Sequence, residues 1–147
     1  MAASTQADLP PEAIAFATRM YDAARTGQID IFQQALPAGL PANMMNEKGD
    51  SLVMLAAYHG HASLVTLLIQ HGADPNRVND RGQTPLAGAV FKGESEVIEA
   101  LLEGGADPDF GTPSAMEAVT LFKQEEKWKK RFEEAKGRGK GKGINGA

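Results

Sequence analysis

The chain has 147 residues, of which 42% are hydrophobic and 23% are charged, and it contains no cysteine. This size and composition fit one soluble domain with a modest core. The lack of cysteine excludes disulfides, zinc–thiolate sites and thiol nucleophiles.

The formal net charge of −4 conceals an uneven distribution. Residues 136–147 carry no negative charge and four positive ones, on Lys136, Arg138, Lys140 and Lys142. The rest of the chain keeps 11 basic residues against 19 acidic ones, which is a net charge of −8. An acidic body disfavours nucleic acid and favours basic protein partners.

The sequence shows no sign of export or membrane insertion. Residues 1–12 have neither the basic start nor the apolar run of a signal peptide. The longest apolar stretches, such as residues 64–69, are too short to span a bilayer. We therefore expect no membrane association and a location in the cytoplasm, the nucleus or both.

In chain order, residues 1–9 are expected to form a flexible N-terminus, and a helix should then start at Pro10-Pro11. Proline is favoured in the first turn of a helix, where its missing N–H is not needed. We expect this helix to run to about Arg25, with four residues available for packing: Ile14, Phe16, Met20 and Tyr21.

Most of the remaining chain is an internal repeat with a period of about 33 residues. Residues 49–76 align with residues 82–109, and three glycine pairs coincide: Gly49 with Gly82, Gly60 with Gly93, and Gly72 with Gly105. The same offset makes residues 23–43 a degenerate first copy. This period indicates a solenoid, in which each unit buries its apolar face by packing on its neighbours.

Each unit is predicted to hold two helices joined by a glycine turn. Thr84 is placed to cap a helix whose first residue is Pro85, and Gly93 ends that helix. Gly105 supplies the left-handed residue that ends the second helix. That helix presents one apolar face, formed by Val97, Ile98, Leu101 and Leu102. Small residues should let the first helices of neighbouring units stack closely: Ala56, Ala57 and Ala89.

The C-terminal part departs from this pattern. Thr112-Pro113 follows Thr84-Pro85 by less than one full period, so we infer that about five residues of the connecting segment are missing. Residues 113–122 then predict a short helix. Residues 125–136 predict a second helix.

The junction and the end of this region leave two expectations. Lys123-Gln124 is either a turn or the middle of one longer helix, and we expect the turn. Trp128 and Phe132 should lie on the buried side of the last helix. Residues 137–147 combine glycine with scattered lysine and show no apolar pattern, so we expect a disordered basic tail.

These residues resemble the ankyrin repeat. Thr84-Pro85-Leu86 is similar to the start of the signature Thr-Pro-Leu-His-x-Ala, and Gly-Ala-Asp-Pro occurs at 72–75 and 105–108. The resemblance implies an all-α solenoid of stacked antiparallel helix pairs joined by β-hairpin-like loops. We expect one domain over residues 10–136, with repeats at about 14–46, 47–79 and 80–111 and a helical cap at 112–136.

The histidines, His59, His61 and His71, are candidates for a metal site. If His61 opens the second helix of its repeat, as the resemblance implies, His71 lies about 14 Å along the helix axis. Zinc ligands lie within about 2.0–2.2 Å of the ion, so the three cannot share one. We expect structural histidines, with no metal and no other cofactor.

We find no catalytic constellation and expect neither an enzyme nor a small-molecule substrate. Ser63 should point to a different helix face from His61. Asp74 and Asp107 occupy the same position in successive repeats, where an aspartate holds the backbone of a turn. The glycine-rich residues 137–143 lack the strand and the Gly-Lys-Ser/Thr end of a phosphate-binding loop.

The resemblance implies a binding surface instead, because the hairpin tips and inner helices of ankyrin arrays form a concave face that binds partners. Tyr58 and Phe91 lie one period apart, and we expect them to form an aromatic ridge on this face. The alternative is that each ring packs against a neighbouring helix. Arg25 and Thr26 extend the same row. The expected partner-binding residues are Met45, Glu47, Lys48, Asp50, Tyr58, His59, Val78, Asp80, Arg81, Gln83, Phe91 and Lys92.

We therefore expect a monomeric module for protein–protein interaction. Its acidic body suggests a basic client, for which the protein would be an adaptor, an inhibitor or an escort. The alternative function is association with nucleic acid through the basic residues 137–147, although no aromatic side chains alternate with those lysines for base stacking.

Overall fold

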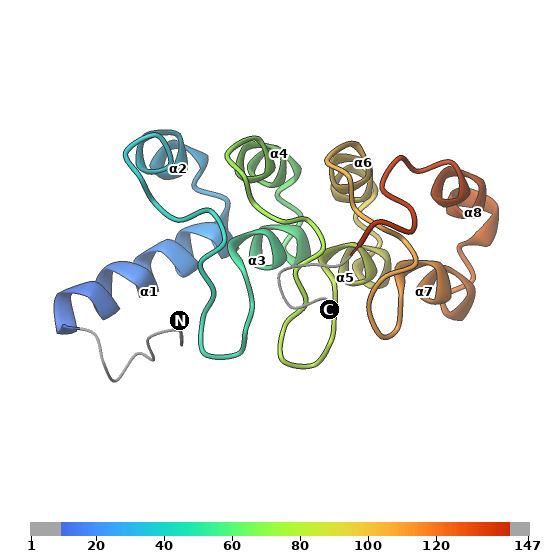
Figure 1. Ribbon diagram of the computed structural model, residues 1–147, viewed down its shortest axis with the longest axis horizontal. Helices are drawn as coiled ribbons and strands as arrows, with labels where there is room; N and C mark the ends of the chain where they lie inside the picture. Colours follow the sequence, from blue (N-terminus) through green and yellow to red (C-terminus); the bar gives the residue numbers. More distant parts are fainter. Residues whose placement is uncertain (1–9, 142–147) are drawn as a thin grey trace.

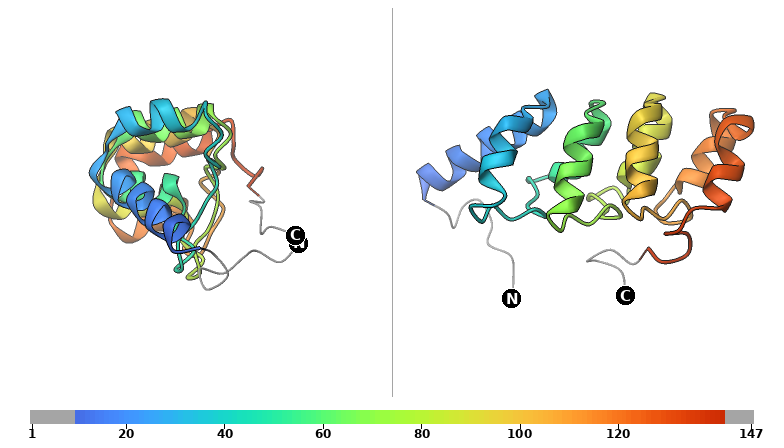
Figure 2. Two further views of the ribbon diagram at one scale, coloured as in Figure 1. Left: turned by 90° about the vertical axis from the view of Figure 1, so that its left-hand side faces the viewer. Right: turned by 90° about the horizontal axis from the view of Figure 1, so that it is seen from above.

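The computed structural model describes residues 10–141 and shows two stacked rows of helices (Figure 1). The inner row holds α1, α3, α5 and α7, and the outer row holds α2, α4, α6 and α8 (Figure 2). Their bounds are α1 Pro11–Thr26, α2 Ile29–Ala35, α3 Leu52–Tyr58, α4 Ala62–Gln70, α5 Pro85–Lys92, α6 Ser95–Glu103, α7 Ala115–Leu121 and α8 Glu125–Glu133. These stacked pairs confirm the predicted all-α solenoid.

The inner helices α3 and α5 begin at side-chain caps that lie one repeat period apart. The Ser51 hydroxyl accepts a hydrogen bond from the Met54 amide at 3.0 Å, and the Thr84 hydroxyl accepts one from the Ala87 amide at 3.2 Å. Such caps satisfy backbone donors that a helix start leaves unpaired. The predicted start of α5 at Thr84 is therefore confirmed.

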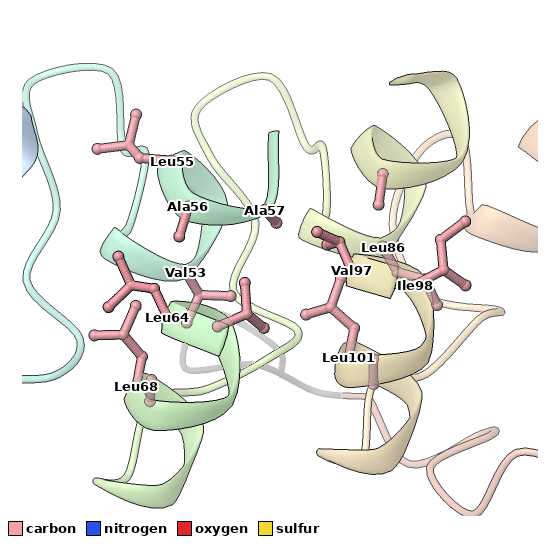
Figure 3. Packing of buried hydrophobic residues seen from close by; sticks show 14 of the residues in the cluster. Val53, Leu55, Ala56, Ala57, Leu64, Leu68, Leu86, Val97, Ile98 and Leu101 are labelled. Atoms are coloured by element: carbon pink, nitrogen blue, oxygen red, sulfur yellow. The ribbon is translucent and has the colours of Figure 1, made fainter. Parts of the chain in front are cut away.

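The core lies between the two rows, where large side chains of the outer helices meet both alanines and larger apolar side chains of the inner helices (Figure 3). Ala56 and Ala57 of α3 and Ala89 of α5 are fully buried, as their predicted role in close stacking requires. Leu68 of α4 and Ile98 of α6 are also fully buried. Each such large apolar side chain contributes about 1.5–3 kcal/mol on burial.

The first inner helix, α1, anchors the first hairpin loop. Tyr21 is buried, and its hydroxyl donates a hydrogen bond to the Met45 carbonyl. Burial raises the pKa of Tyr21, and the nearby Glu47 carboxylate raises it further. Phe16, expected to pack, is instead 42% exposed, because no described helix precedes α1 in the array.

The last helix pair begins two residues later than the Thr-Pro match suggests. Ser114, not Thr112, caps α7: its hydroxyl accepts from the Glu117 amide at 3.1 Å, and the Glu117 carboxylate accepts from the Ser114 amide at 2.8 Å. Counted from Thr84, Ser114 falls only three positions short of one full period, so three positions are missing rather than five. A Ser-x-x-Glu capping box satisfies backbone donors at a helix start in both directions, so α7 begins after Ser114 and not after Thr112.

The predicted turn between the two C-terminal helices is present. Phe122 ends α7, Lys123 has a positive φ of 56°, and α8 begins at Glu125. Trp128 and Phe132 are buried as predicted, with ring centroids 6.1 Å apart.

The turns that leave the outer helices form a hydrogen-bonded ladder along one edge, which we call the turn side. The Asn43 side chain accepts from the Asp74 amide at 2.7 Å, and the Asn76 side chain accepts from the Asp107 amide at 2.7 Å. Each aspartate in turn accepts from the amide two residues later, at 2.8 Å from Asn76 and 2.9 Å from Asp109. Asp74 and Asp107 thus hold the turn backbone, as expected.

The start of the basic tail completes the turn side. The buried carboxylate of Asp107 accepts hydrogen bonds from the amides of Gly139 at 2.9 Å and Gly141 at 2.7 Å. Arg138 donates to the Asp109 carboxylate at 2.7 Å. This differs from the disordered tail expected over 137–147, because glycine amides can approach a buried carboxylate closely. Residues 142–147 of that tail, and the N-terminal residues 1–9, lie outside the described part of the chain.

Candidate functional site

Two hairpin loops project beside the inner helices and are held rigid by the same device, one repeat period apart. The Asn46 side chain accepts from the amides of Lys48 and Asp50, each at 3.0 Å. In the next loop, the Asn79 side chain accepts from the amides of Arg81 at 2.9 Å and Gln83 at 3.1 Å. The turn chemistry of asparagine therefore fixes both tips.

The two loops are also bonded to one another. The Asp80 amide donates to the Lys48 carbonyl at 3.1 Å, and the Asn79 side-chain amide donates to the Asp50 carboxylate at 3.0 Å. These bonds join successive repeats, so the two hairpin loops form one continuous surface, which we call the hairpin wall.

Between this wall and the inner helices α1 and α3 lies a groove of about 550 Å³. Eight of the twelve expected partner-binding residues line it: Glu47, Lys48, Asp50, Tyr58, His59, Asp80, Arg81 and Gln83. Arg25, which extends the row of Tyr58, lines it as well. The groove also takes in residues that were not expected there: Asn46, Met54, Leu55 and Asn79.

Four expected residues lie outside the groove. Met45 belongs to the framework, because its carbonyl accepts from Tyr21 and its sulfur lies 3.8 Å from an Arg77 nitrogen. Val78 is half-buried near the base of the second loop. Phe91 and Lys92 lie next along the inner row, on α5.

The charges of the groove are balanced rather than acidic. Its lining has three carboxylates, on Glu47, Asp50 and Asp80, and three cationic side chains, on Arg25, Lys48 and Arg81. Within residues 10–141, the one ion pair that involves any of these six joins Arg25 to Asp22 at 2.7 Å. Over that range the other five charges have no ionic partner and can meet a ligand.

Tyr58 and Phe91 share the inner row, but each leans towards the following helix rather than on the other ring. The Tyr58 ring lies over Gly88 of α5, where an added Cβ atom would be 3.6 Å from its Cδ1 atom. Phe91 contacts Phe122 edge-on, with ring centroids 5.3 Å apart. Both rings keep an open face, since Tyr58 is 38% and Phe91 56% exposed.

His59 lies among cationic neighbours on the same face. Its ring meets the Tyr58 ring edge-on at 5.6 Å, and the Lys92 ammonium lies 4.8 Å from the centre of the Tyr58 ring. Partial burial lowers the pKa of His59 below its ordinary value of 6.5, and the positive charges of His61, Lys92 and Arg25 lower it further. The surroundings thus favour the neutral imidazole.

His61 has a structural position at the start of α4. Its Nε2 atom lies 2.7 Å from the Arg25 carbonyl oxygen, which ties the second repeat to the first. His71 lies at the other end of α4. In residues 10–141 no three histidine, aspartate or glutamate side chains cluster closely enough to hold a metal ion.

An apolar cluster at the end of the inner row is a feature that the repeat alignment does not predict. Leu121 is 65% exposed and Phe122 43% exposed, next to Phe91. An alignment of Thr112-Pro113 with Thr84-Pro85 moves Leu121 out of the row of Tyr58 and Phe91, so it does not predict this cluster. Counting instead from the Ser114 cap puts Leu121 in the row of Tyr58 and Phe91, so the Ser-x-x-Glu box is the signal that could have found it.

The comparisons with known proteins agree with this architecture. Residues 20–111 match the family described as ankyrin repeats, three copies. The chain belongs to the ankyrin-repeat family. It is also 46% identical, over 67 residues, to a protein of Pseudomonas aeruginosa named "Putative ankyrin repeat protein PA3287". That match covers 46% of this chain and 39% of the relative, so the chain spans about two-fifths of the curated relative that it matches.

Membership of the ankyrin-repeat family makes the fold a scaffold whose typical role is protein–protein interaction. The groove and the inner row leave charged and aromatic side chains exposed here. Within the described residues, no helix is long and apolar enough to cross a membrane.

Proposed function

We propose that this ankyrin-repeat protein binds a partner protein through the concave face formed by the hairpin wall and the inner row. The observation that supports this most strongly is the state of the polar groups on the two sides of the molecule. On the turn side, the side chains of Asn43, Asn76 and Asp107 are engaged in internal hydrogen bonds. On the concave face, charged tips and aromatic rings stay exposed on a rigid support.

Such a surface has the ingredients of a protein interface. Exposed aromatic side chains are the usual anchors of binding hot spots, and Tyr58 and Phe91 are held by helices rather than by loops. Because the scaffold is already ordered, little binding free energy is lost in ordering it. We propose a binding role without catalysis.

The charges of the concave face predict a different partner from the one that the net charge of the whole chain predicts. The acidic body suggests a basic client, but the groove itself carries as many cationic as anionic side chains. Three of the 19 acidic residues lie on α6, where Glu99 and Glu103 pair with Arg131 at 3.1 and 3.3 Å. A basic client is therefore not favoured by this face.

The alternative through the basic tail has less support. Arg138, one of its four cationic side chains, is already bonded to Asp109. The concave face adds acidic tips at Glu47, Asp50 and Asp80, which oppose a phosphate backbone. The relative is bacterial, and a bacterium has no nucleus, so we propose the cytoplasm as the place of action.

A capture experiment tests the proposed function. The full chain and the double variant Tyr58→Ala with Phe91→Ala are immobilised in parallel, exposed to a native extract, and the bound proteins are quantified by mass spectrometry. We expect at least one protein held by the wild type and lost by the double variant. Phe16→Ala, which removes an exposed ring from α1, is the matched control and should retain it.

Equal melting temperatures of the variants would show that the fold is intact. Capture of the same proteins in the same amounts by wild type and double variant would contradict binding through the concave face.

A further inference from the structure

The C-terminal ends of the inner helices line up into a strip with two kinds of side chain. Its cationic part comprises Arg25 of α1 and Lys92 of α5, with the neutral imidazole of His59 at the end of α3 between them. Its apolar part comprises Phe91, Leu121 and Phe122. We call these six residues the inner strip. Cations suit helix C-termini, where the helix dipole is negative.

The cationic part is locally positive although the whole chain carries −4. The Lys92 ammonium lies 4.8 Å from the centre of the Tyr58 ring, and the His59 ring meets the same ring edge-on at 5.6 Å. Partial burial, and then the charges of Lys92 and Arg25, lower the pKa of His59, so its imidazole is held neutral between the two cations. Asp22 bonds one nitrogen of Arg25 and leaves its remaining donors available.

The apolar part is an exposed cluster rather than a scatter of single residues. Phe91 and Phe122 meet at 5.3 Å with an interplanar angle of 65°, and Leu121 beside them is 65% exposed. Contiguous exposed apolar surface on a soluble fold marks an interaction site. These side chains come from α5 and α7, which pack against each other, so they form one surface.

We propose that the inner strip binds an acidic peptide segment of a partner protein, with carboxylates over Arg25 and Lys92, beside the neutral N–H of His59, and one apolar anchor on Phe91, Leu121 and Phe122. This inference rests on the proposed function and names the kind of partner. A basic segment would meet two like charges here, on Arg25 and Lys92. A nucleic acid strand, with a charge on every nucleotide, would need a longer row of cations.

The spacing of the helices sets the spacing of the peptide. Packed helix axes lie about 8–10 Å apart, and an extended peptide advances about 3.3 Å per residue. One inner helix therefore corresponds to about three residues of peptide. An acidic residue over Lys92 or His59 should lie about three to six residues from the anchor.

A peptide selection tests this directly. A random library of displayed peptides about twelve residues long is selected on the immobilised full chain, and the enriched peptides are synthesised for fluorescence anisotropy. We expect two or more Asp or Glu residues and an aromatic or aliphatic anchor at that spacing. Replacing the acidic residues by Gln should weaken binding at least about tenfold.

Matched protein variants then locate the site. Lys92→Glu and Leu121→Ser should each weaken binding at least about tenfold. Lys129→Glu on α8 and Phe16→Ser on α1 alter side chains that are also exposed but lie outside the strip, and they should bind as the wild type does. Thermal unfolding of all four variants checks that the fold is kept.

Several outcomes would overturn the proposal. They are a selection that yields no peptide, enriched peptides that are basic, equal effects of Lys92→Glu and Lys129→Glu, or displacement of the peptide by a short oligothymidine. Phosphoserine at the acidic positions that tightens binding more than about tenfold would replace the carboxylate partner by a phosphopeptide.

The outcomes also separate the inference from the proposed function. Peptides without acidic bias that are lost on Tyr58→Ala with Phe91→Ala would end the inference and keep the concave face as the binding site. Peptides that are insensitive to every change on that face would end both.

Discussion

The turn side and the concave face are built from the same repeats but use their polar groups in opposite ways. On the turn side, Asn76 and Asp107 are buried and bonded to backbone amides of the next repeat or of the tail. On the concave face, Glu47, Lys48 and Arg81 project from tips that the side chains of Asn46 and Asn79 already hold. The turn side therefore stabilises the array, and the concave face is left available for recognition.

A comparison of the middle of the turn side with its C-terminal end shows why a basic glycine-rich tail belongs to the fold. The Asp74 turn in the middle of the array is covered by a neighbouring repeat, whereas the Asp107 turn is covered by residues 137–141. A repeat array needs its last apolar and polar groups closed off. The tail supplies backbone amides where another repeat would otherwise stand.

The largest effect should come from Asp107→Ala. This change removes an acceptor of three backbone amides, those of Asp109, Gly139 and Gly141, and leaves them without their partner. We expect the free energy of unfolding to fall by about 3 kcal/mol. Asp74→Ala, which removes an acceptor of one amide, should cost about 1 kcal/mol. Urea unfolding followed by circular dichroism measures both, and equal losses would contradict a special role for the tail.

A smaller loss is expected for Gly137→Ala. A Cβ atom on Gly137 would overlap the carbonyl oxygen of Gly105, so the tail must shift away from the third repeat. We expect a loss of about 1–3 kcal/mol, as for other overpacked sites. Lys140→Ala, at an exposed position of the same segment, is the control and should unfold as the wild type does. A tail that tolerates both changes alike would not be docked in solution.

The smallest effect concerns protonation on the concave face. NMR titration of His59 should give a pKa below 6.5, and Lys92→Met should raise that pKa only slightly, because partial burial is the larger cause. Since the folded state holds this proton less tightly than the unfolded chain, the stability that His59 contributes is present above pH 6.5. It is lost as the pH falls through the lowered pKa. An unchanged pKa in Lys92→Met would show that the two side chains do not interact.

The repeat architecture could be predicted because it depends on local chemistry that recurs once in every repeat. Glycines at the helix ends, Thr84 before Pro85, and alanines at the stacking positions each specify their own part of the chain. The hairpin positions followed from the same offset, and most of the expected surface residues do lie around one groove. Whether they bind a partner stays a prediction.

Two features could not be predicted, for different physical reasons. The docking of residues 137–141 depends on main-chain amides, which are the same for every sequence, and on a buried carboxylate that is distant in the chain. The exposed Leu121 and Phe122 depend on where α7 begins, and the Thr112-Pro113 pair resembles a helix start that the structure does not use. The Ser114-x-x-Glu117 box is the sequence signal that marks the actual start of α7, and it places Leu121 in the row of Tyr58 and Phe91.

The separation of the two sides is tested most directly by measuring partner affinity and unfolding free energy on the same three proteins. These are the wild type, Tyr58→Ala with Phe91→Ala, and Asn76→Ala, with a captured partner or a selected peptide as ligand. The double variant should bind at least about a hundredfold more weakly and unfold nearly as the wild type does. Asn76→Ala should lose about 1–2 kcal/mol of stability and keep its affinity within about twofold. A double variant that binds as tightly as the wild type would contradict the account.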